Sequence, residues 1–90
     1  MIETIEVTNI QSGAKKTLRV GRYVKNSFLV RWPMAESIEI RRNGDGQLVS
    51  QPRSFFQRWK LEKHSADALQ TAITERQQQI KEMIAKERAT

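Results

Sequence analysis

Residues 17–32 decide the fold, and they read TLRVGRYVKNSFLVRW. In the first half, apolar side chains alternate with polar ones and share one face: Leu18, Val20 and Val24. Arg22 interrupts this face, and a short polar turn follows at residues 25–27. The alternation then resumes with Phe28, Val30 and Trp32. Two alternating runs joined by a short polar turn predict an antiparallel β-hairpin with strands at 17–24 and 28–32.

Similar runs on both sides of this hairpin predict further strands of the same sheet. Residues 4–8 and 37–41 alternate in the same way. Residues 43–46 read Asn-Gly-Asp-Gly, a composition that favours the positive φ angles of tight hairpin turns. Residues 47–50 then supply the return strand. Pro33 is expected to end the strand at 28–32, because proline lacks the N–H that a sheet needs for its hydrogen bonds.

The segment 55–61 is compatible with two structures. As a strand it places Phe55 and Trp59 on one face, and as a helix it brings Phe55, Phe56 and Trp59 together. We expect the strand. Trp32 is in phase with an apolar face and is expected in the core, whereas Trp59 has cationic neighbours and fits either the core or a stacking position.

From Ser65 onward the pattern is helical, and no Gly or Pro interrupts it up to Ala89. Ser65 is a favourable N-cap, and Asp67 in the first turn complements the helix dipole. About 25 helical residues at 1.5 Å each span roughly 37 Å, whereas the rest of the chain makes a globule of roughly 28 Å in diameter. We therefore expect one domain, with a basic antiparallel β part at 1–64 and a helix at 65–90 that overhangs it.

The predicted fold class is α+β. It consists of a small twisted antiparallel sheet of about five strands followed by a long C-terminal α-helix. The sequence is also compatible with a sheet that curls into an SH3-like barrel.

Positive charge is concentrated in the same part of the chain as the first hairpin. The 90 residues carry a formal net charge of +6, and no acidic residue occurs from Val7 to Ala35. This stretch contains six cations: Lys15, Lys16, Arg19, Arg22, Lys25 and Arg31. The other ten Lys and Arg balance all ten Asp and Glu. A local basic surface is typical of a protein with a polyanionic partner.

The strand phase predicts which of these residues act together. The predicted binding residues for nucleic acid or another polyanion are Lys15, Lys16, Arg19, Tyr23, Lys25 and Arg31. Cations supply a salt-sensitive attraction to phosphates, and an exposed tyrosine stacks on an unpaired base, as suits single-stranded nucleic acid or an RNA loop. Two alternatives stay open: an acidic protein surface as partner, or basic residues that only decorate a solvated strand.

The C-terminal helix carries a second predicted contact surface. Its apolar stripe has a 3-4 spacing that Arg76 and Glu87 complete, and the interruption at Arg76 is unfavourable for a long coiled coil. The first half of the stripe is expected to pack on the sheet. Ile80, Met83 and Ile84 are predicted to contact a second copy or a protein partner, because so polar a helical tail is marginal in water on its own.

Catalytic and metal-binding chemistry has little support. The chain has no Cys and one His, His64, which we expect to be a solvated residue near the helix start. It contains no phosphate-binding loop, nucleophile elbow or cluster of metal ligands. No cofactor, no metal and no enzymatic activity are therefore expected. The N-terminal residues resemble neither a signal peptide nor a membrane anchor, so the expected location is cytoplasmic with no membrane partner.

These observations favour a non-enzymatic, small basic nucleic-acid-binding or accessory protein. Its cationic sheet face would bind the polyanion, and its helix would contact a second copy or a partner. The alternative is a protein-interaction module, either a small inhibitor or an adaptor. Such a module would dock on an acidic surface of a larger complex, for example one that processes nucleic acid.

Overall fold

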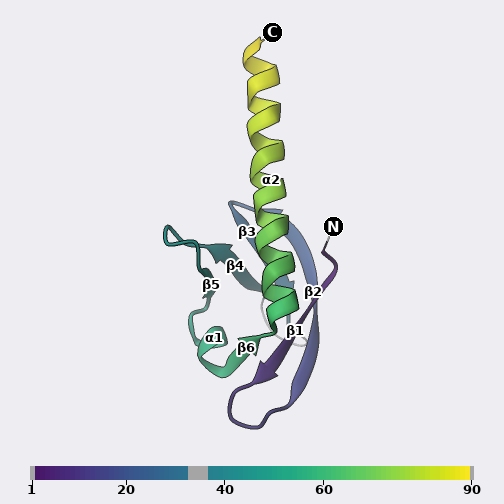
Figure 1. The fold of residues 1–90 in the computed structure, drawn as a ribbon, viewed down its shortest axis with the longest axis vertical. Coiled ribbons are helices and arrows are strands. Elements are labelled where there is room, and N and C mark those ends of the chain that lie inside the picture. Colours follow the sequence, from purple (N-terminus) through teal and green to yellow (C-terminus); the bar gives the residue numbers. More distant parts are fainter. Residues whose placement is uncertain (1, 33–36, 90) are drawn as a thin grey trace.

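The computed structural model describes residues 2–32 and 37–89, and it shows a curled antiparallel sheet followed by a long helix (Figure 1). The strands are β1 Thr4–Asn9, β2 Lys15–Val24, β3 Ser27–Arg31, β4 Ile38–Arg42, β5 Leu48–Gln51 and β6 Trp59–Leu61. The helices are α1 Ser54–Arg58 and α2 Lys63–Ala89. Within the described residues the sheet is a six-stranded half-barrel in the order β5-β4-β3-β2-β1-β6, so the predicted α+β class is confirmed. Pro33, the expected strand stop, lies outside the described residues.

The hydrophobic core lies between the inner face of the sheet and α2. The sheet contributes alternate residues of its central strands: Ile5, Val7, Leu18, Phe28, Val30, Ile38 and Ile40. The first half of α2 contributes Leu69, Ala72 and Ile73. Each fully buried aliphatic side chain stabilises the fold by about 1.5–3 kcal/mol, so this contact is what holds α2 on the sheet.

The turn predicted at 43–46 joins β4 to β5. The Asn43 amide donates to the Gln47 carbonyl at 2.8 Å, and the Gly46 amide donates to the Asn43 carbonyl at 3.0 Å. Gly46 has a φ of 81°, a conformation that glycine adopts without strain. The Asn43 side-chain oxygen accepts hydrogen bonds from the Asp45 and Gln47 amides. The loop is therefore the hairpin that its composition predicts.

The register of β2 shifts in the middle of the strand. Val20 pairs with Val30, but Tyr23 pairs with Phe28, so β2 contains a bulge between Val20 and Tyr23. The shift turns Tyr23 towards the core, where its ring lies 4.8 Å from that of Phe28, and leaves Val24 41% exposed. The expectation that Val24 faces inward and Tyr23 outward is therefore wrong, because strict alternation assumes a strand without a bulge.

The ambiguous segment 55–61 divides into a helix and a strand. Residues 55–58 belong to α1, so the expected strand is wrong there, whereas residues 59–61 form β6 on the free edge of β1. The buried hydroxyl of Ser50 donates to the Pro52 carbonyl at 2.8 Å and accepts from the Phe56 amide at 3.4 Å. These bonds support the first turn of α1 and place Phe55 in the core.

The helix α2 begins at Lys63, two residues before the expected start. The sequence predicts that Ser65 caps the helix, and this prediction is wrong. The Ser65 side chain instead forms a hydrogen bond with strand β1. Its hydroxyl oxygen accepts a hydrogen bond from the Glu6 amide at 2.8 Å, beside the bond from the Glu62 amide to the Glu6 carbonyl at 3.0 Å. Glu62 and the first turn of α2 therefore continue the hydrogen bonding of β1 beyond the end of β6.

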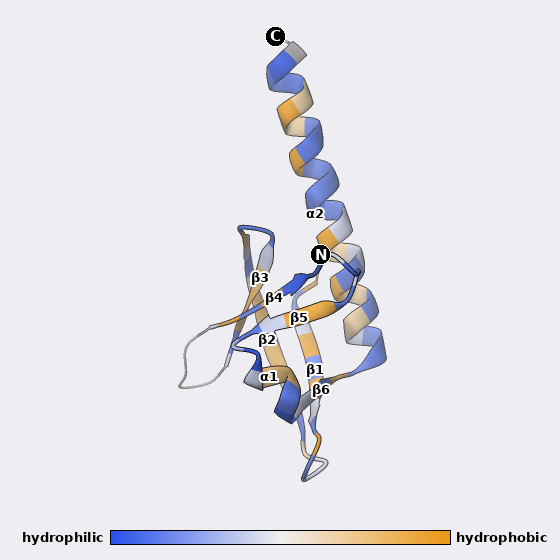
Figure 2. Cartoon of the chain, turned by 90° about the vertical axis from the view of Figure 1, so that its left-hand side faces the viewer, coloured by the Kyte–Doolittle hydropathy of each residue, from blue (hydrophilic) through white to orange (hydrophobic). Residues whose placement is uncertain are grey.

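The second half of α2 projects away from the β domain (Figures 1 and 2). The molecule measures 55 × 27 × 21 Å, and the helix accounts for its length. A hydrogen bond from Arg42 to the Gln77 side chain, at 2.8 Å, ties the middle of α2 to the sheet. Along the described residues, no helix is long and apolar enough to cross a membrane.

Candidate nucleic-acid interface

Two arginines lie opposite each other on the outer face of the sheet, away from α2. Val20 and Val30 pair on the inner face, so the neighbouring pair of Arg19 and Arg31 projects from the outer face. Both arginines are exposed. Directly opposed like charges destabilise a sheet, since their Cβ atoms are about 5 Å apart. Neither guanidinium forms an ion pair with any described residue, so both charges are available to an external anion.

Lys15 extends this surface along β2. It lies on the same face as Arg19, four residues away, which is about 13 Å along a strand. We call Lys15, Arg19 and Arg31 the outer cationic row. These are the three predicted binding residues that the fold brings to one face.

The two ends of the outer cationic row differ in their surroundings. The hydroxyl of Thr8 donates a hydrogen bond to Glu62, and this bond holds the pKa of the Glu62 carboxyl below its ordinary value. The positive charges of Lys15, His64 and Lys60 lower this pKa further. Glu62 therefore stays ionised and offsets charge at the Lys15 end, whereas the described residues offer no such carboxylate contact to the arginine pair.

The other three predicted residues do not join the outer cationic row. Lys16 pairs with Val7 on the inner face, and its Nζ lies 4.7 Å from the centroid of the Trp32 ring. Lys25 occupies the tip of the β2–β3 hairpin with a φ of 51°. Tyr23 packs towards the core, so the prediction of an exposed stacking tyrosine is wrong.

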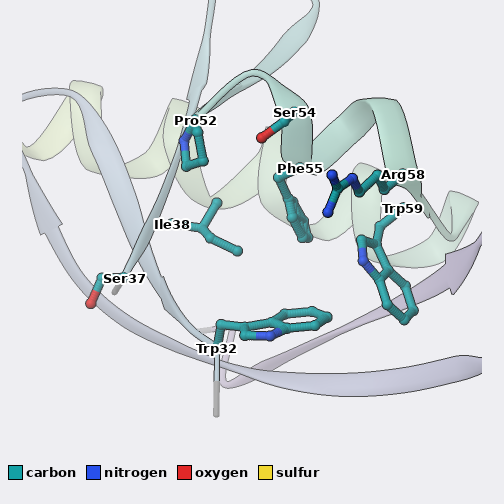
Figure 3. A pocket seen from close by; sticks show the side chains of 8 residues that line it. All are labelled: Trp32, Ser37, Ile38, Pro52, Ser54, Phe55, Arg58 and Trp59. Atoms are coloured by element: carbon teal, nitrogen blue, oxygen red, sulfur yellow. The ribbon is translucent and has the colours of Figure 1, made fainter. Parts of the chain in front are cut away.

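An aromatic pocket lies at the rim of the inner face (Figure 3). Its walls include Trp32, Phe55 and Trp59, with the Trp32 ring centroid 5.9 Å from that of Phe55 and 5.1 Å from that of Trp59. The pocket has a volume of about 400 Å³. Arg58 lines it, and Lys16 lies over both tryptophan rings, at 4.7 and 5.7 Å from their centroids.

This pocket combines flat apolar walls with positive charge. No carboxylate belongs to the described residues that line it. Such a site suits a planar or apolar group that carries an anion nearby. Sequence reasoning missed the pocket as a unit, although the clustering of Trp59 with cationic neighbours allowed a stacking role for that residue.

Groups for catalysis remain scattered over the described residues. They contain no cluster of three or more His, Cys, Asp or Glu side chains that could hold a metal ion. His64 is exposed, and its Nε2 lies 3.3 Å from a Glu6 carboxylate oxygen. This contact is a surface interaction at the start of α2.

No protein-family model, curated protein or solved structure matches this chain.

Proposed function

We propose that the chain is a non-enzymatic nucleic-acid-binding or accessory protein that contacts phosphates through the outer cationic row. The observation that carries this proposal is the opposition of Arg19 and Arg31. Two guanidinium groups held side by side repel each other, and an anion between them turns that repulsion into attraction. Guanidinium groups also bind phosphate oxygens through paired hydrogen bonds, which makes arginine well suited to this role.

The proposed binding is mainly electrostatic. With Tyr23 packed against Phe28, the outer face supplies cations without the predicted aromatic partner. Contacts of this kind go to the phosphate backbone, which carries little sequence information. The expected ligand is therefore the phosphate backbone of a nucleic acid, bound with little sequence preference and with a strong dependence on salt, and single strands serve as the first probe.

A fluorescence anisotropy titration with labelled single-stranded DNA and RNA tests this proposal. The double variant Arg19→Glu/Arg31→Glu should weaken binding at low salt by at least about tenfold. The matched control Lys81→Glu/Lys86→Glu makes the same change in net charge on the exposed, projecting half of α2. This control should lose much less affinity. Negligible binding by the unmodified protein at low salt, or equal losses in both variants, would contradict the proposal.

A second candidate is a protein-interaction module, a small inhibitor or adaptor that docks on an acidic surface of a larger complex. The aromatic pocket favours it, because tryptophan and arginine are the residues most enriched at the energetic centres of protein interfaces. Stable co-purification with one protein after nuclease treatment would support this candidate. Loss of that complex in Trp59→Ala, with retention in Arg19→Glu/Arg31→Glu, would assign the contact to the pocket.

A further inference from the structure

The projecting part of α2, residues 76–88, exposes an apolar surface that nothing in the β domain covers. Ile80, Met83 and Ile84 are 42%, 62% and 45% exposed. In Figure 2 the apolar residues of this part appear as separate patches on a hydrophilic helix. The polar composition suits a helix exposed to solvent, but it does not explain why large apolar side chains recur along this part.

Two of these side chains, Ile80 and Met83, belong to a ridge that starts inside the core. Leu69 and Ile73 of this ridge are fully buried against the sheet. The same 3-4 spacing continues outward through four residues: Arg76, Ile80, Met83 and Glu87. The interval between them is four, then three, then four residues, so the pattern is symmetric about the point between Lys81 and Glu82.

This symmetry makes the ridge complementary to itself in the antiparallel direction. When two copies are aligned about that point, Ile80 lies opposite Met83 of the second copy, and Arg76 lies opposite Glu87 of the second copy. Each pairing occurs twice. A parallel alignment would instead place Arg76 against Arg76 and Glu87 against Glu87, and such like-charge contacts oppose association.

Arg76 lacks a carboxylate partner within its own described chain. Its side chain is half-buried, and it donates one long hydrogen bond, to the Gln79 side chain at 3.5 Å. The symmetry point is also the middle of residues 76–88, a segment whose first turn contains Gln77, the residue that Arg42 anchors to the sheet. In the antiparallel alignment, the C-terminal end of the second copy's helix lies beside Arg76. Residues 76–88 of the two copies therefore lie side by side over about 20 Å.

We propose that a second copy of this chain packs antiparallel along residues 76–88 and forms a homodimer. Its two-fold axis passes between Lys81 and Glu82 of both copies, and the two β domains lie at opposite ends of the helix pair. Ile84 flanks the apolar centre. The contact contains few apolar side chains, so the dimer is expected to dissociate on dilution. This proposal does not depend on nucleic-acid binding.

Sedimentation equilibrium of the nuclease-treated full chain tests the dimer through a charge swap. Arg76→Glu alone and Glu87→Arg alone should each raise the dimer dissociation constant by about tenfold, because two attractive contacts become repulsive. The double variant should recover to within about threefold of the unmodified protein. Residues 76 and 87 of one helix are about 16 Å apart, so this recovery cannot arise within one chain. A monomer at all concentrations, or no recovery in the double variant, would overturn the proposal.

Cysteine cross-linking tests the direction of the helices, since the chain has no cysteine of its own. Arg76→Cys and Glu87→Cys should not form disulfide-linked dimers separately, because equivalent residues lie about 16 Å apart in the antiparallel pair. An oxidised mixture of the two should yield the linked heterodimer, in which the other Arg76–Glu87 contact is intact. Self-linking of each variant without the mixed product would establish a parallel pair and overturn the proposed arrangement.

Discussion

Arg19 of β2 and Arg31 of β3 lie directly opposite each other on the outer face of the sheet, both exposed. Opposed like charges reduce the stability of a sheet, and a ligand-binding surface tolerates this loss when the charges serve the ligand. Under the proposed function, the pair therefore links stability to phosphate binding. Removing one arginine should increase the stability of the sheet and weaken phosphate binding.

Replacing Arg31 with Thr should raise the free energy of unfolding by about 0.5 kcal/mol, because repulsion from Arg19 is removed. Chemical denaturation measures this change. The control is Arg41→Thr, since Arg41 lies on the same face opposite the uncharged Ser27 and Val49. An equal gain in both variants would show that the effect comes from threonine itself.

The side chain of Arg42 ties the β4–β5 hairpin to α2. It donates hydrogen bonds to the side-chain oxygens of Gln70, Thr74 and Gln77, at 3.3, 3.0 and 2.8 Å. Arg42→Met should lower the free energy of unfolding by about 2 kcal/mol, since a charged donor and its partners lose their bonds. The neighbouring substitution Arg41→Met, on the outer face, should change it much less. Similar denaturation curves for the two variants would contradict this role.

The bond from Thr8 to Glu62 makes stability depend on pH at the acidic end of the range. Because the folded-state pKa of Glu62 is lowered, its contribution to stability is present above the unfolded pKa and is lost as the pH falls through the folded pKa. Thr8→Val should raise the pKa of Glu62 towards its ordinary value, as measured by NMR titration of the carboxyl group. Thr17→Val, elsewhere on the outer face, serves as the control. An unchanged titration of Glu62 in Thr8→Val would refute the assignment.

The hydroxyl of Tyr23 is buried and has no hydrogen-bond partner in the part of the chain that the structure describes. Tyr23→Phe should therefore raise the free energy of unfolding by up to about 1 kcal/mol, because an unsatisfied polar group leaves the interior. Thermal and chemical denaturation give this value. A destabilisation of similar size would mean that the hydroxyl has a partner.

The sequence predicts most of the strands because alternation and turn composition are local signals. The loop at 43–46 needs a residue with positive φ and provides Gly46. The bulge in β2 is different, since it depends on how β2 and β3 pair. A Cβ on Gly21 would lie only 3.0 Å from the Leu29 carbonyl oxygen, a close approach that no alternation pattern reveals. Because of this bulge, Tyr23 faces the core and not the outer face that the sequence predicts.

The outer cationic row was easier to predict than the aromatic pocket, because strand phase is a local signal and tertiary pairing is not. Lys15, Arg19 and Arg31 share a face through simple strand phase and pairing. The aromatic pocket brings together Trp32 and Trp59, which are 27 positions apart in the sequence and meet only because β6 joins the edge of β1. Tertiary pairing of this kind has no local signature.

The salt dependence of binding tests the central claim most directly. The measurement is the slope of the logarithm of the binding constant against the logarithm of salt concentration, with a single-stranded oligonucleotide and two proteins, unmodified and Arg19→Gln/Arg31→Gln. Each phosphate contact contributes about 0.7 to this slope for a single strand, so loss of two contacts should reduce its magnitude by about 1.4. The same slope for both proteins would contradict the account, because it would mean that Arg19 and Arg31 do not contact the phosphates.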